Sequence, residues 1–167
     1  MSKIAGWFKK LIGRELPEYM KGISLGEDAG WCINFKKADF CLFLRELKTL
    51  FPKDSIMFLE GSTPKIAREL TTMQINTDTK VARGTYGKTS VFHIPLIEEN
   101  LNRLIALFDK HAIPEICDHF HVYKDNKVLL EGYDILDQEV YLANTVDEAL
   151  IKTFCTKLNC TYSTHQR

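Results

Sequence analysis

The sequence predicts one α+β domain with a mixed, mostly antiparallel sheet, about four packing helices and an N-terminal amphipathic helix. Three observations support this class. The length of 167 residues fits a single domain. Apolar residues make up 45% of the chain, which is enough for a substantial core. Short apolar runs typical of strands alternate with longer segments of helical periodicity.

The first element in chain order is a helix over residues 3–14. Its apolar residues recur at the spacing of one helical face, and its wet face carries basic but no acidic side chains. This pattern suits an anionic membrane surface or a protein partner, and equally packing on the chain's own domain. The residues expected to make the membrane or partner contact are Ile4, Trp7, Phe8, Lys9, Lys10, Leu11 and Ile12.

The remaining chain divides by composition. Residues 15–30 contain several glycines with little periodicity and predict a linker. Residues 31–160 hold the periodic segments and predict the single α+β domain. Residues 161–167 are polar and predict a flexible tail.

Four helices are expected within the domain, over residues 40–51, 64–73, 97–111 and 146–158. Asp39 is a suitable N-cap for the first of them, and Pro52 ends it. Pro64 suits the first position of the second helix. Thr145 and Glu148 have the spacing of a capping box for the last helix.

Strands are expected where short runs rich in β-branched and aromatic residues are bounded by turn residues, at 31–35, 55–60, 80–86, 90–94, 119–124, 128–133 and 139–143. Asp125 and Asn126 predict a tight turn between two of these strands. The β-α-β order at the start predicts some parallel pairing, whereas the hairpins require antiparallel pairing.

Charge and cysteine content restrict the classes of partner and compartment. The 22 basic and 22 acidic side chains cancel, which argues against a nucleic-acid-binding protein. The five cysteines form no CxxC pair, and no secretory signal or membrane-spanning run is visible. We therefore expect reduced thiols in a cytoplasmic protein, peripheral at the inner face of a membrane if residues 3–14 anchor it.

Residues 82–89, ARGTYGKT, superficially resemble a phosphate-binding loop. Such a loop must open a helix, because the helix N-terminus forms part of the anion site. The residues that follow, SVFHIP, predict a strand instead. We interpret the segment as a hairpin turn and expect no nucleotide-binding site.

Cys117, His119 and His121 alternate along a predicted strand and therefore share one face. A thiolate with two imidazoles is a set that zinc accepts. Further ligands, if the fold brings them near, are His93, His111 and Glu115. The simpler interpretation is that Cys117 is a core residue and the two histidines are structural. A nucleophilic Cys117 would need a base from another strand, for example His93.

Three functional hypotheses remain open. The first is a non-catalytic protein-binding or regulatory module, comparable at fold level to toxin-neutralising and adaptor domains. The second is a metal-binding protein or enzyme centred on Cys117, His119 and His121, with zinc as the metal. The third is a peripheral membrane protein anchored by residues 3–14. The first is favoured because no complete catalytic set is visible, and it requires no cofactor.

Overall fold

The computed structural model describes residues 20–35, 39–84, 89–134 and 139–165. The predicted helix over residues 3–14 and its expected contact residues lie outside these ranges. No helix in the described ranges has both the length and the apolar character needed to span a bilayer.

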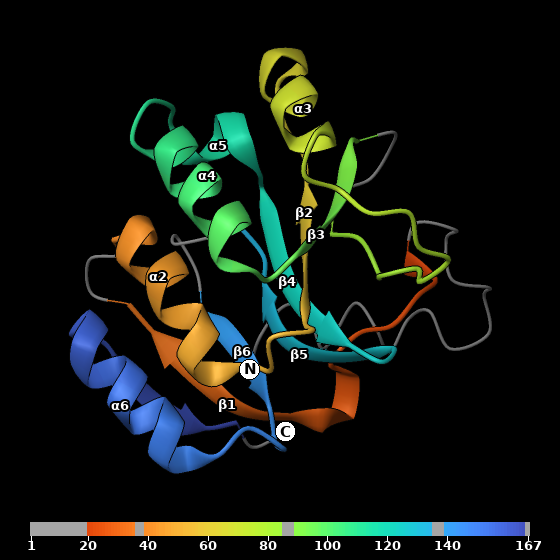
Figure 1. Cartoon of the computed structure of the whole chain (residues 1–167). Helices are drawn as coiled ribbons and strands as arrows, with labels where there is room; N and C mark the ends of the chain where they lie inside the picture. Colours follow the sequence, from red (N-terminus) through yellow and green to blue (C-terminus); the bar gives the residue numbers. More distant parts are fainter. Residues whose placement is uncertain (1–19, 36–38, 85–88, 135–138, 166–167) are drawn as a thin grey trace.

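The described residues form one seven-stranded antiparallel sheet, so the α+β class is confirmed (Figure 1). Its strands are β1 (Ala29–Asn34), β2 (Ile56–Glu60), β3 (Val91–Pro95), β4 (His119–Lys124), β5 (Lys127–Gly132), β6 (Val140–Ala143) and β7 (Thr161–Thr164). Their order across the sheet is β3-β2-β4-β5-β6-β1-β7. The expected parallel pairing of β1 with β2 is wrong. These two strands are not neighbours, because β4, β5 and β6 lie between them in the sheet.

Five α-helices and one 3₁₀ turn accompany the sheet in the described ranges. They are η2 (Gly26–Asp28), α2 (Phe40–Leu50), α3 (Pro64–Thr71), α4 (Glu98–Phe108), α5 (Ile113–Ile116) and α6 (Glu148–Leu158). Figure 1 shows α2 between α4 and α6 over one face of the sheet. The short helix α5 was not predicted from the sequence. Its Pro114 occupies the first turn, where a proline replaces an amide that has no helical partner.

The helix starts show which capping predictions hold. Asp39 caps α2, and its carboxylate accepts a hydrogen bond from the Leu42 amide at 3.0 Å. The Thr145 capping box is wrong, because Asp147 caps α6 instead and accepts from the Ala149 amide at 2.8 Å. Ionised carboxylates at helix starts also interact favourably with the helix dipole.

The helix-covered face of the sheet holds the aromatic core. Phe43 of α2 lies at its centre, with ring centroids 5.2 Å from Phe40, 5.9 Å from Phe120 of β4 and 5.9 Å from Phe154 of α6. Phe43 is 1% exposed. The Phe43 ring therefore packs between α2, α6 and the central strand β4.

The opposite face of the sheet is polar. Direct register pairs form one row across all seven strands, and because strand residues alternate between faces this row points away from Phe120. From β3 to β7 the row reads His93, Phe58, His121, Glu131, Tyr141, Cys32 and Ser163. Several titratable side chains thus share the face that α2, α4 and α6 leave uncovered.

Two chain segments, residues 22–25 and 80–84, cover part of this polar face and are called the strap. Ile23 and Val81 form a parallel bridge that joins them, with the Ile23 amide 2.8 Å from the Lys80 carbonyl. The predicted strand at 80–86 is wrong in its described part, since only Val81 pairs there, and β3 pairs with β2 instead. A Cβ at Gly22 would lie 2.6 Å from the Ala82 nitrogen, so the two segments approach too closely for any side chain there.

Two predicted chain boundaries differ from the structure. Within the expected linker, Leu25 is 2% exposed and its amide donates to Glu131 of β5 at 2.8 Å, so this part packs on the domain. Residues 161–164, expected in a polar tail, form β7 and pair with β1. Backbone pairing orders these polar residues although the sequence gives them little apolar content.

Candidate functional site

Glu60 is the most buried charged residue of the polar face, with no exposed surface. Among the described residues, its carboxylate accepts hydrogen bonds from Arg83 Nε at 3.0 Å, the Gly84 amide at 2.8 Å and Thr89 Oγ1 at 2.9 Å. A buried carboxylate held by a cation and two further donors is well compensated for its loss of water. The strap and the start of β3 are thereby fixed to the end of β2.

The two histidines of β4 lie next to this carboxylate network, on the same face of the sheet. His119 is paired in register with Glu60, and its Nδ1 accepts a hydrogen bond from the Asp134 amide at 3.1 Å. His121 lies between Phe58 and Tyr133, with ring centroids 5.5 and 5.0 Å away. Its side chain has no exposed surface, and neither ring nitrogen has a hydrogen-bond partner among the described residues.

The predicted zinc set is not assembled by the fold. Cys117 is the C-cap residue of α5 and is completely buried in the hydrophobic core. In the described part of the chain, no three His, Cys, Asp or Glu side chains are grouped so that they could hold a metal ion. The geometry gives the zinc hypothesis for Cys117, His119 and His121 no support, and it stays a prediction.

The further residues proposed for that site have other partners. His111 and Glu115 pair with each other at 3.2 Å. His93 Nδ1 lies 2.8 Å from the Tyr123 hydroxyl, and Phe58 stands between His93 and His121 in the row.

A nucleophilic role for Cys117 is disfavoured for a separate reason. Burial strongly raises the pKa of the Cys117 thiol, and the charge of Asp118 adds to this. The thiolate is the reactive form of cysteine, so a high pKa makes Cys117 inert.

The environment of His121 predicts a pH-dependent stability. Burial, with a smaller contribution from His119, lowers the pKa of His121 to about 3. In the unfolded chain the imidazole of His121 takes up a proton as the pH falls below about 6.5, whereas in the folded chain it stays neutral down to about pH 3. The free energy of unfolding is therefore highest above about pH 6.5 and falls as the pH drops towards 3. The free energy of unfolding should lose up to about 1.4 kcal/mol per pH unit from this residue. Urea unfolding at pH 7, 6 and 5 measures the slope.

The variant His121→Leu tests the cause of that slope. Leucine removes the titration and two buried nitrogens that lack partners, so the variant should be as stable as the parent at pH 7 and less sensitive to acid. His111→Phe is the matched control, because that imidazole pairs with Glu115 near the surface. An unchanged acid slope in His121→Leu would show that His121 is not responsible.

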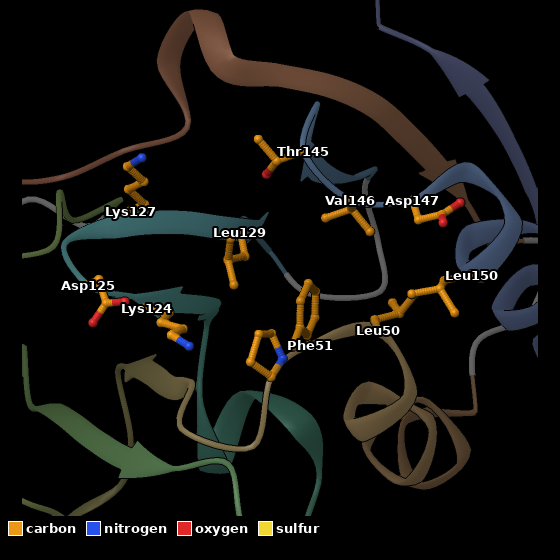
Figure 2. Close-up of a pocket in the computed structure, with 11 residues that line it drawn as sticks. Leu50, Phe51, Lys124, Asp125, Lys127, Leu129, Thr145, Val146, Asp147 and Leu150 are labelled. Atoms are coloured by element: carbon orange, nitrogen blue, oxygen red, sulfur yellow. The ribbon is translucent and has the colours of Figure 1, made fainter.

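A hollow of about 430 Å³ opens on the surface, away from the polar face (Figure 2). It lies between the end of α2, the β4–β5 turn and the start of α6. Its apolar lining consists of Leu50, Phe51, Pro52, Leu129, Val146 and Leu150. Figure 2 shows Lys124 and Lys127 on one side of the hollow and Leu150 on the other.

The two lysines at the rim differ in their ion pairing. Lys124 pairs with Asp54 at 2.8 Å, and this hydrogen-bonded carboxylate raises the pKa of Lys124. In the ranges that the structure describes, Lys127 makes no ion pair, although it is exposed at the same rim. Leu150 is 42% exposed and lies at the same rim, beside the apolar lining of the hollow.

Sequence reasoning missed the buried acids Glu60 and Glu131. Each ends or interrupts an apolar strand run, IMFLE in β2 and VLLEG in β5. An acid inside such a run is the sequence signal that could have identified both. The apolar neighbours predict that the carboxylate is buried, and a buried carboxylate needs hydrogen-bond donors around it. Their partners Arg83 and Leu25 are distant along the chain and carry no such signal.

No protein-family model matches the chain, and comparison with curated proteins and with solved structures gave no match. Function is therefore inferred from the residues themselves.

Proposed function

We propose that this chain is a non-catalytic protein-binding module, and that the hollow beside Leu150 receives an apolar side chain of the partner. The observation that carries the proposal is an apolar floor joined on one surface to an exposed leucine and to a lysine that makes no ion pair with any described residue. Interface centres typically combine an apolar anchor pocket with a polar rim. Asp125 and Asp147 also line the hollow, so we expect the partner's acidic residue to lie on the side of Lys127, beside its apolar anchor.

The chemistry of the polar face supports a binding role over catalysis. Glu60 is paired with Arg83 of the strap, and Cys117 and His121 have no exposed surface. A catalytic acid, base or nucleophile must reach its substrate. Groups buried in this way do not reach a substrate in this structure.

Photo-crosslinking from two exposed aliphatic positions tests the proposal. A photoreactive amino acid replaces Leu150, at the hollow, or Ile97, which is 44% exposed and lies outside it. In cells that produce the full chain at its native level, we expect a discrete crosslinked partner from position 150 and none from position 97. Crosslinked partners are identified by mass spectrometry.

A charge reversal refines the result. Lys127→Glu should reduce the crosslink from position 150 by about tenfold, because it places a like charge against the acidic group of the partner. Lys48→Glu is the matched control, since Lys48 pairs with Glu98 elsewhere on the surface. Identical adducts from positions 97 and 150, or no adduct from 150, would contradict the proposed surface.

A further inference from the structure

The C-terminal end of α6 places two cysteines against each other. Asn159 adopts the left-handed conformation, with φ 51° and ψ 43°, and ends the helix. The Cys160 amide then donates back to the Cys155 carbonyl at 3.0 Å, and the Asn159 amide to the Thr156 carbonyl at 3.4 Å. These bonds define a Schellman motif, in which the side chains at the positions of Cys155 and Cys160 touch. That contact is normally between apolar side chains, and here it joins two thiols.

The two thiols differ in their access to solvent. Both are free, and the Schellman geometry brings their side chains together. Cys155 is 3% exposed and lies on the face of α6 that packs in the core, whereas Cys160 is only partly buried. A solvent reagent therefore meets Cys160 first, with Cys155 directly behind it.

The two neighbouring thiols differ in acidity. Interaction with Cys160, with burial as the smaller cause, raises the pKa of Cys155, and interaction with Cys155 lowers the pKa of Cys160. A lower pKa favours the thiolate form of Cys160, and the negative end of the α6 dipole acts in the opposite direction.

The other cysteines have no such arrangement. Burial, followed by the charge of Glu139, raises the pKa of Cys32 to about 11. Burial and the Asp109 carboxylate raise the pKa of Cys41, and Cys117 is completely buried. Low thiolate content makes a cysteine slow to react.

We propose that Cys155 and Cys160 form a redox-reactive dithiol site, in which Cys160 is the attacking thiolate and Cys155 the resolving thiol. With hydrogen peroxide as oxidant, the Cys160 sulfur attacks one oxygen and the O–O bond breaks. The leaving hydroxide takes up the proton lost by Cys160 and becomes water, and Cys160 becomes a sulfenic acid. The Cys155 sulfur then attacks the Cys160 sulfur, the S–O bond breaks, and a second water leaves with the Cys155 proton.

The product is a disulfide that ties the end of α6 to the strand β7. Two thiols are oxidised and one peroxide is reduced to two waters. In a reducing compartment such a bond is transient, and thiol exchange returns the dithiol.

Trypsin provides a direct readout, because it cleaves after Lys157 between the two cysteines. The reduced full chain is treated with peroxide at neutral pH, its remaining thiols are capped with iodoacetamide, and it is digested without reductant. We expect the peptides 153–157 and 158–167 to remain joined, at a mass lower by two hydrogens than their sum. Recovery of both as separate capped peptides would overturn the proposal.

Cys41 is the internal control, since it is also partly buried but lacks a neighbouring thiol. Iodoacetamide should modify Cys160 on the order of tenfold faster than Cys41 at neutral pH. In Cys155→Ser, peroxide should leave a sulfenic acid at Cys160 that a diketone probe captures. Equal alkylation rates, or a disulfide that forms as fast in urea as in the folded chain, would show that the fold does not activate the pair.

Discussion

Replacing Glu60 with alanine is expected to lower the free energy of unfolding by about 3–5 kcal/mol. The variant leaves the Arg83 guanidinium, the Gly84 amide and the Thr89 hydroxyl without their common acceptor. The Arg83 side chain is only 22% exposed, so water replaces the lost carboxylate poorly. Urea unfolding followed by circular dichroism measures the change. A loss of this size is a large share of the roughly 5–15 kcal/mol that stabilises a typical domain.

A surface acid provides the comparison for Glu60. Glu98 pairs with Lys48 at 2.7 Å, and its side chain is 70% exposed. Glu98→Ala should change the free energy of unfolding by less than about 1 kcal/mol, because exposed ion pairs contribute little. Similar losses in Glu60→Ala and Glu98→Ala would mean that the Glu60 network is as well hydrated as the surface pair.

Phe43→Ala is expected to cost about 3–5 kcal/mol through the cavity it leaves. Phe43 contacts Phe40, Phe120 and Phe154, so its removal loosens α2 from both β4 and α6. The neighbouring helices cannot close the gap without losing their own contacts. Thermal unfolding should show a clearly lower midpoint, while the far-ultraviolet spectrum at low temperature stays that of the parent.

The control for Phe43 is Ile75→Ala. Ile75 is 38% exposed, so its truncation removes apolar surface without opening an internal cavity. We expect a change within about 0.5 kcal/mol. An equally small effect for Phe43→Ala would contradict the central position of its ring in the core.

Local patterns predicted the elements of this fold better than their arrangement. Asp39 and the apolar spacing after it are enough to specify α2, because capping and amphipathicity act within a few residues. The same reasoning gave the turn at Asp125 and Asn126, whose positive φ angles suit a tight hairpin. The partners of β1 were not predictable, since β6 and β7 are selected by long-range pairing that leaves no local pattern.

The same limit applies to the candidate sites. The alternation of Cys117, His119 and His121 correctly placed both histidines on one face of β4, but not the aromatic rings that enclose His121. Whether such a residue becomes a ligand or a buried group depends on what covers it. Gly84 illustrates the difficulty: a Cβ there would lie 2.6 Å from His119 Nε2, a contact that only the folded strap creates.

The position of β1 has a consequence for how the chain acquires its structure during synthesis. Residues 29–34 pair with residues 140–143 on one side and 161–164 on the other. A nascent chain therefore carries this strand with both edges unpaired until β6 and β7 have been made. Contacts of such high sequence separation slow folding and expose unpaired edges to aggregation. Translation must proceed past residue 140 before β1 gains its first neighbour, and past residue 161 before it gains its second.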